Sequence, residues 1–418
     1  MAQAKDRMTP DRVAIVYGST AGIGGLGQSV CSAITAVADG TRPTYAFGPG
    51  HSPVWSLPGG IPQAQWEQAS PGIWPWMARY SWLRWRSGDL AFARDRYMGR
   101  WAARHVERIR PRYCYLFTQV ARETLRWARA EGVVTAIDNP NGHIRNFQQV
   151  SEREMLRWFG RIYNQHPSGA MLERVEEEYE LVDRVRVYSE WGRRSMTRFG
   201  VPADKIHIIH QSINLERYRP PAERPQIAGP LRVCYVGSLD LRKGFPYLLR
   251  AIRAVGAQYF ALEIVGATGD RHCAQLFNRE RSGLNVKCAP GDTVAAYQRA
   301  ELLVVPTLED GLPFVLVEGM ACGLPVIVTE EAGAAECVQP GRTGWVIPAA
   351  RVEPLTAALE HALRRRGDLW EMGRQARADV EQYTGPTQLR ELSNWFYSSA
   401  SSCSESPICS NSPREVCS

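Results

Sequence analysis

Residues 301–348 carry the side chains whose types and spacing best suit chemistry. An acidic pair, Glu309 and Asp310, follows a buried-strand pattern, and Glu318 lies near the start of an otherwise apolar helical stretch. Carboxylates accept hydrogen bonds from vicinal hydroxyls, and a glycine such as Gly311 lets backbone N–H groups approach a ligand closely. Such N–H groups and a helix N-terminus favour phosphate. The segment therefore favours a site for a ligand that carries both hydroxyls and phosphate.

A glycine-rich turn near the N-terminus is a second candidate site. Residues 22–27 fit the pattern G-x-G-x-x-G and follow a buried-strand pattern at residues 11–20. A nicotinamide site needs an acidic residue about 20 residues further on, but the second strand pattern, residues 44–47, contains none. The pattern therefore disfavours an oxidoreductase. It leaves open a ligand-facing loop that includes Gly24 and Gly25, or a plain tight turn.

Alternating strand and helix patterns place these residues in two α/β halves. Such alternation is typical of doubly wound parallel sheets, whose ligands bind at the carboxyl ends of the strands. We therefore expect two Rossmann-like domains that face a central cleft. The strand patterns lie at residues 11–20, 44–47, 114–118, 133–137, 181–189 and 206–210, and then at 231–237, 262–265, 302–305, 325–329 and 345–347, with a helix at 245–255.

Composition gives the expected domain boundaries. The proline-rich residues 220–230 are typical of a linker and separate a first domain, residues 1–219, from a second, residues 231–385. Residues 386–397 are expected to form a C-terminal helix, and the Ser/Cys-rich residues 398–418 to be a low-complexity, disordered tail.

The overall composition excludes several classes of protein. Of the 418 residues, 44% are hydrophobic and 22% are charged, which excludes a wholly disordered chain. The sequence has no apolar run long enough to span a bilayer and no signal-peptide pattern at its start. It contains ten cysteines without a C-x-x-C pair, which is typical of a reducing compartment. We therefore expect a cytoplasmic protein.

The segment 301–348 resembles the donor-site signature of the retaining glycosyltransferases of family four, which adopt the GT-B fold of two Rossmann-like domains. In that family an acidic residue and a glutamate eight positions later precede a helix that reads EAMACGLPV, and Asp310 and Glu318 occupy these positions. The resemblance implies that Asp310 contacts the donor hexose and that Glu318 binds the ribose. Asp310 is shorter than the usual glutamate, so Glu309 is the alternative partner of the hexose.

Two further segments carry the same resemblance. Residues 233–244 are similar to the family's strand and phosphate-binding loop, with Lys243 at its lysine, and residues 187–220 are similar to the end of its first domain. The family usually has an arginine where this chain has Ser238, and Arg242 is the alternative source of that charge. The donor-binding residues implied by the resemblance are Gly24, Gly25, Ser238, Arg242, Lys243, Glu309, Asp310, Gly311, Leu312, Pro313, Phe314 and Glu318.

His143 directly follows a strand pattern, where a cleft residue is expected. The resemblance implies a histidine in the first domain near the reacting sugar, where it orients a hydroxyl or supports developing charge. A buried structural histidine is the alternative. The expected catalytic residues are therefore His143, Lys243, Asp310 and Glu318.

The formal net charge of +7 is concentrated in residues 72–112. A helical repeat of four places arginines on one face, with aromatic residues beside them. Such a face suits an anionic membrane surface, and a solvated helix face is the alternative. No module that reads nucleic acid accompanies it. The repeating arginines are Arg96, Arg100, Arg104, Arg108 and Arg112, and the upstream tryptophans are Trp74, Trp76, Trp82 and Trp85.

The resemblance implies a metal-independent, retaining hexosyltransferase, and the basic segment leads us to expect that it is peripheral to the inner membrane face. Its donor, a nucleotide-diphosphate sugar, is a co-substrate, and no other cofactor is expected. The acceptor is expected to be a glycan or a lipid-linked glycan that binds in the first domain. The sequence has no D-x-D motif and no His/Cys cluster with metal-ligand spacing. A catalytically idle subunit of the same fold that binds a glycan or a membrane is the alternative.

Overall fold

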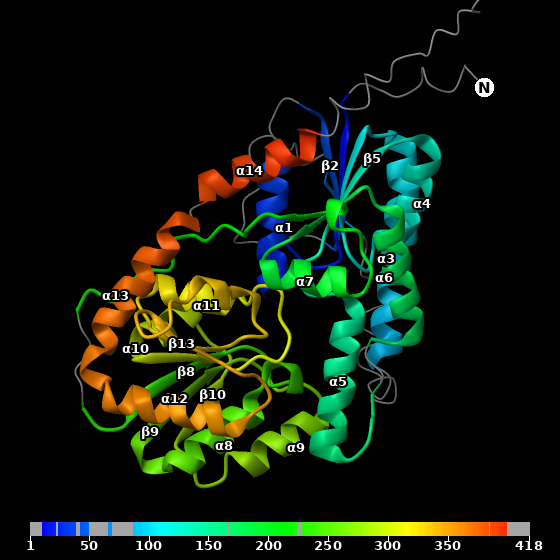
Figure 1. Ribbon diagram of the computed structural model, residues 1–418. Coiled ribbons are helices and arrows are strands. Elements are labelled where there is room, and N and C mark those ends of the chain that lie inside the picture. Colours follow the sequence, from blue (N-terminus) through cyan, green and yellow to red (C-terminus); the bar gives the residue numbers. More distant parts are fainter. Residues whose placement is uncertain are drawn as a thin grey trace, which may run out of the picture.

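The computed structural model describes residues 11–21, 24–38, 42–49, 66–68, 87–164, 167–223, 228–383 and 385–398. Two parallel sheets, each packed among helices, form two domains that meet at a central interface (Figure 1). The first sheet has seven strands in the order β3-β2-β1-β4-β5-β6-β7. Its strands are β1 (Val13–Val16), β2 (Thr44–Gly48), β3 (Trp66–Gln68), β4 (Tyr113–Phe117), β5 (Val134–Asp138), β6 (Arg184–Val187) and β7 (Ile206–Ile208).

The second sheet has six strands in the order β10-β9-β8-β11-β12-β13. In both sheets the strand order reverses beside the first strand of the domain, and the carboxyl ends at such a reversal are where doubly wound folds bind ligands. The predicted α/β class with two Rossmann-like domains is confirmed. The strands are β8 (Leu231–Val236), β9 (Phe260–Val265), β10 (Val286–Ala289), β11 (Leu302–Val305), β12 (Val326–Thr329) and β13 (Gly344–Ile347).

Helices connect the strands in both domains. The first domain contains α1 (Gly24–Val37), α3 (Ser87–Ile109), α4 (Arg122–Glu131), α5 (Ile144–Phe159), α6 (Gly169–Leu181) and α7 (Glu190–Arg198). The second contains the short 3-10 turn η5 (Leu241–Lys243), α8 (Phe245–Val255), α9 (Arg271–Glu280), α10 (Thr293–Arg299), α11 (Phe314–Ala321), α12 (Val352–Arg364) and α13 (Leu369–Val380).

The last helix, α14 (Gly385–Tyr397), returns from the second domain to the first and lies beside α1 (Figure 1). Leu392 and Phe396 on α14 belong to the buried core of the first domain. The Tyr397 hydroxyl donates to the Val37 carbonyl at 2.6 Å. The chain therefore crosses between the domains twice, once between β7 and β8 and once before α14. The predicted tail, residues 398–418, lies outside the described residues beyond Ser398.

Candidate donor-binding site

A cavity of about 460 Å³ lies between the two domains. From the second domain it is lined by the carboxyl ends of β8 and β11, including Gly237 and Thr307. From the first domain it is lined by Gln28 on α1 and by Pro140 and Asn141 after β5. The cavity therefore occupies the position that the reversal of strand order predicts for a ligand in each domain.

Lys243 and Asp310 form an ion pair inside this cavity, between the Lys243 Nζ and Asp310 Oδ2 atoms. The Asp240 side chain caps η5 and accepts from the Lys243 N–H at 3.0 Å, which holds the lysine at the carboxyl end of β8. Gly244 follows with φ of 72°, and a Cβ there would lie 1.9 Å from the Pro306 carbonyl oxygen. Only glycine fits this position, so the Lys-Gly pair turns the chain and aims the lysine at the cavity.

The loop that carries Asp310 is held by two backbone hydrogen bonds, one that Asp310 donates and one that it accepts. The Asp310 N–H donates to the Glu331 carbonyl at 3.1 Å, and the Gly333 N–H donates to the Asp310 carbonyl at 2.8 Å. A Cβ on Gly311 would lie 2.1 Å from the Pro140 carbonyl oxygen. The close approach that Gly311 allows is thus one between the two domains. Leu312, Pro313 and Phe314 continue from this loop into α11 and line the cavity.

Glu318 lies one turn into α11 and faces the same cavity. Its Oε1 atom accepts from the Tyr218 hydroxyl at 2.7 Å, and its Oε2 atom accepts from the Tyr297 hydroxyl at 3.0 Å. Burial raises the pKa of the Glu318 carboxyl, and the two tyrosine bonds and nearby Arg217 oppose that rise. Each oxygen keeps a lone pair, so the carboxylate can still accept from ligand hydroxyls.

Glu309 and Asp310 are adjacent but face different surroundings. The Glu309 side chain is 1% exposed and does not line the cavity. It meets Gly142 of the first domain and Arg242 of the second. Asp310, and not Glu309, is therefore the acid of this loop that faces the cavity. Arg242 does line the cavity, although its guanidinium donates to the Glu309 carbonyl at 2.7 Å.

Ser238 follows β8 but is exposed and does not line the cavity. Its hydroxyl donates to the Asp240 carboxylate, so it helps to hold the side chain that caps η5. Gly24 and Gly25 are the first two residues of α1, which lines the cavity through Leu26 and Gln28. The surroundings of these two glycines and of residues 22–23 lie outside the described residues.

His143 is buried and does not line the cavity. It is the N-cap of α5, where its Nδ1 atom accepts from the Arg145 N–H at 3.2 Å. Its ring stacks on Phe199 with a centroid distance of 4.8 Å. Burial lowers the pKa of His143 to about 4. Lys243, Asp310 and Glu318 therefore line one cavity. His143 does not line it and instead is a buried N-cap of α5.

Sequence patterns did not reveal the two tyrosines that bind Glu318. Tyr218 lies where residues 209–230 leave the first domain, and Tyr297 lies on α10. Neither belongs to a motif that indicated a ligand. The only signal is the resemblance of residues 187–220, which includes Tyr218 but assigns it no partner.

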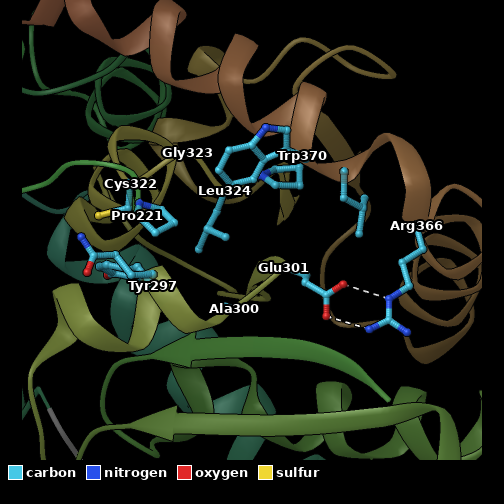
Figure 2. A pocket seen from close by; sticks show the side chains of 12 residues that line it. Pro221, Tyr297, Ala300, Glu301, Cys322, Gly323, Leu324, Arg366 and Trp370 are labelled. Carbon is cyan, nitrogen blue, oxygen red and sulfur yellow. Dashed lines mark hydrogen bonds and ion pairs between the residues drawn. The ribbon is translucent and has the colours of Figure 1, made fainter. Parts of the chain in front are cut away.

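Figure 2 shows a second pocket, between Pro221, Cys322 and Trp370. Its volume is about 30 Å³, which is roughly the share of one water molecule. The Glu301–Arg366 ion pair closes one side, with a shortest distance of 2.8 Å. This pocket is too small for a sugar nucleotide. It marks where the chain leaving the first domain packs against the second.

The predicted basic face lies on α3. Arg96, Arg100, Arg104 and Arg108 are exposed, and within the described residues none of them makes an ion pair. The aromatic stripe beside them partly faces inward, because Trp101 packs against Phe47 with ring centroids 6.2 Å apart. The upstream tryptophans lie outside the described residues.

No described helix combines the length and the apolar character needed to cross a bilayer. In the same part of the chain, no three His, Cys, Asp or Glu side chains are grouped so that they could hold a metal ion.

Comparison with known proteins gives the class of the second domain. Residues 230–365 match the family model described as "Glycosyl transferases group 1". The solved structure of sucrose-phosphate synthase from Thermosynechococcus elongatus superposes with a TM-score of 0.74 and 17% identity, over 94% of this chain and 100% of that one. HepE from Anabaena, solved in complex with UDP and glucose, gives a TM-score of 0.63 and 14% identity, over 94% and 100%. The chain therefore has the GT-B fold, and its residues 230–365 are similar to the glycosyltransferase group 1 family.

Curated relatives match over part of the chain. The amylovoran biosynthesis glycosyltransferase AmsK of Erwinia amylovora is 28% identical over 219 residues, which cover 48% of this chain and 53% of that protein. The putative colanic acid biosynthesis glycosyltransferase WcaL of Escherichia coli K12 is 27% identical over 173 residues, which cover 38% and 42%. The chain thus matches about half the length of these relatives.

Proposed function

We propose that the protein is a retaining hexosyltransferase that moves a hexosyl group from a nucleotide-diphosphate sugar to a hydroxyl of a glycan or lipid-linked acceptor. One observation carries the proposal: Lys243, Asp310 and Glu318 line a single cavity between two doubly wound domains. A cation for phosphate and two carboxylates for hydroxyls are the groups that such a donor requires. Retention of configuration rests on the resemblance to family four.

In this proposal Lys243 meets the diphosphate. The bond to the hexose breaks with the electrons leaving on the diphosphate, so negative charge develops there and a positioned cation lowers the barrier. Asp310 forms an ion pair with Lys243. When phosphate takes over the lysine, Asp310 is free to accept hydrogen bonds from the hexose hydroxyls.

Glu318 holds the ribose in this proposal. The two tyrosine hydroxyls fix both carboxylate oxygens, at 2.7 and 3.0 Å. Because both oxygens are held, the orientation of the carboxylate is fixed. Its remaining lone pairs then point in fixed directions, which suits the two neighbouring hydroxyls of a ribose. The bond from Tyr218 also ties the carboxylate to the segment that joins the domains.

The acceptor enters from the first domain. Gln28 and Asn141 provide polar contacts on that wall of the cavity, and Leu26, 45% exposed, provides an apolar one. In this proposal, closure of the cavity between the two domains around the donor excludes water, which would otherwise hydrolyse it. We place Gly24 and Gly25, just before Leu26, where the backbone approaches donor or acceptor. The transfer needs no metal ion in this scheme, because cations and helix N-termini carry the charge.

Two sets of relatives support the substrate classes. One solved neighbour, HepE, forms a complex with UDP and glucose, and the names of AmsK and WcaL refer to the biosynthesis of amylovoran and colanic acid. By analogy we assign this chain a role in polysaccharide biosynthesis. The exposed arginines of α3 suit an anionic inner membrane face, at about 1 kcal/mol per well-placed cation, so we place the protein in the cytoplasm at that surface.

The experiment that tests the proposal is release of nucleoside diphosphate from a panel of sugar nucleotides, with and without a membrane lipid extract. Release from one donor that rises with the extract supports a hexosyltransferase with a membrane-borne acceptor. Binding of nucleotide without release, in protein shown to be folded, would replace the enzyme with an idle binding subunit.

A further inference from the structure

Glu309 is the residue at which the two domains and the donor loop meet. Its Oε1 atom accepts from the Gly142 N–H of the first domain at 3.2 Å. Its Oε2 atom accepts from Arg242 of the second domain at 3.3 Å, and its backbone carbonyl accepts from the same guanidinium at 2.7 Å. The side chain is 1% exposed. One buried carboxylate thus has one partner from each domain.

Burial of a carboxylate is unfavourable unless its partners compensate. Arg242 is a partner whatever the arrangement of the domains, because it lies on η5 of the same domain. The Gly142 N–H is a partner only while the first domain is in place. Separation of the domains would return the Glu309 carboxylate to water and remove this bond. Both partners are therefore present only while the two domains are in contact at this point.

Arg242 depends on Glu309 for its position. Its guanidinium lies 5.3 Å from the ring centre of Phe147 on α5, so it also touches both domains. It lines the cavity beside Lys243. Without the Glu309 carboxylate, Arg242 keeps its bond to the Glu309 carbonyl and its contact with Phe147, but it loses the charged acceptor that holds the guanidinium from the side.

We propose that Glu309 is a positioning residue that couples closure of the domains to the placement of Arg242 at the cavity. This inference rests on the proposed function, in which Lys243 meets the leaving diphosphate, and it adds Arg242, beside Lys243 in the cavity lining, as a second cation for that charge. The two neighbouring acids then have different roles. Asp310 pairs with Lys243 and faces the donor, whereas Glu309 pairs with Arg242 and faces the other domain.

The first test measures the interdomain bond by amide hydrogen exchange of the full chain without ligand. Glu309→Ala removes the acceptor of the Gly142 N–H, and exchange at that amide should rise at least about tenfold, the scale expected for loss of one hydrogen bond. Glu309→Gln keeps an oxygen acceptor, so exchange should stay within about threefold. Glu331→Gln is the matched control, because the Glu331 carboxylate accepts from Trp191 across the same interface and does not touch Arg242. Unchanged exchange in Glu309→Ala would overturn the proposal.

The second test uses turnover of the donor identified from the panel. Glu309→Gln should lower kcat about tenfold and change the KM for donor by less than about threefold, because Arg242 is displaced from the developing charge. Combined with Arg242→Ala, it should add no further loss, since Glu309 acts through that arginine. Additive losses, or a wild-type kcat in Glu309→Gln, would overturn the positioning role. If the wild type releases no nucleotide, the proposed function fails, and the exchange experiment still decides whether Glu309 joins the domains.

Discussion

Tyr218 and Glu318 lie one hundred positions apart and are joined by a hydrogen bond of 2.7 Å between the tyrosine hydroxyl and the glutamate Oε1 atom. The bond connects the segment that leaves the first domain to the helix that lines the cavity of the second. It fixes one oxygen of the carboxylate that we assign to the ribose. The other oxygen is held by Tyr297, which belongs to the second domain alone.

Replacement of Tyr218 by phenylalanine should therefore weaken nucleotide binding. The loss of one hydrogen bond to a charged group costs about 1.5–3 kcal/mol, which corresponds to roughly 10- to 100-fold in the dissociation constant of the nucleoside diphosphate. Isothermal titration calorimetry measures this directly. Tyr297→Phe is the matched comparison: its ring is fully buried, so it should lower the thermal unfolding temperature more than Tyr218→Phe does. Wild-type affinity in Tyr218→Phe would contradict the role assigned to this bond.

Lys243→Ala and Glu318→Ala should each lower turnover on the order of 100-fold, the scale of losing one positioned charge at a site where charge develops. Arg364→Ala is the control for loss of a cation, because Arg364 is 68% exposed at the end of α12 and pairs with Glu360, away from the cavity. Steady-state release of nucleoside diphosphate measures all three. Near wild-type turnover in both site variants would remove Lys243 and Glu318 from the reaction.

The lowered pKa of His143 predicts a pH dependence of stability. Burial lowers this pKa from 6.5 to about 4. Between these two pH values His143 is therefore mostly protonated in the unfolded chain and mostly neutral in the folded chain. The free energy of unfolding should therefore fall as pH drops from 6.5 towards 4, by up to about 3 kcal/mol at one pKa unit per 1.36 kcal/mol. His143→Asn keeps a capping acceptor for α5. In this variant the fall in the free energy of unfolding that His143 causes should disappear. Urea unfolding at pH 7 and pH 5 tests this, and an identical pH dependence in the two proteins would refute it.

The exposed arginines of α3 predict binding to anionic vesicles. A variant with Arg96, Arg100, Arg104 and Arg108 all changed to glutamine should lose on the order of 100- to 1000-fold in partitioning, at about 1 kcal/mol per cation. A control with the same loss of charge changes Arg279, Arg299, Arg364 and Arg374, each of which already pairs with an acid. Cosedimentation with vesicles that contain or lack phosphatidylserine compares the two. Equal losses in both variants would mean that net charge, and not this face, governs binding.

The sequence predicted the fold where hydrophobic patterns are strong. The predicted helix at 245–255 and strand at 302–305 agree with α8 and β11 to the residue. The strands β3 and β10 were missed. β10 is an edge strand whose residues alternate between exposed and partly buried, so it lacks the apolar run that marks a central strand. The pattern at 181–189 begins in the last residue of α6, because apolar residues continue from helix to strand.

The site was predictable only where one domain defines it. Lys243, Asp310 and Glu318 lie in segments of a single domain. Asp310 and Glu318 are eight positions apart, and Lys243, 67 positions before Asp310, follows β8, the strand that pairs with β11 ahead of Asp310. Which of the two acids, Glu309 or Asp310, faces the cavity depends on the first domain, because the Gly142 N–H of that domain donates a hydrogen bond to the Glu309 carboxylate. The burial of His143 against Phe199 likewise depends on how α5 and α7 pack. No local pattern in a sequence encodes these tertiary contacts.

The most direct test of the central claim is nucleoside diphosphate release by the purified full chain across a panel of sugar nucleotides, with and without membrane lipid extract. We predict that nucleoside diphosphate is released from one donor and that the lipid extract increases this release. In Lys243→Ala, both the release and its increase with the extract should be lost. No release from any donor by folded protein would contradict the claim.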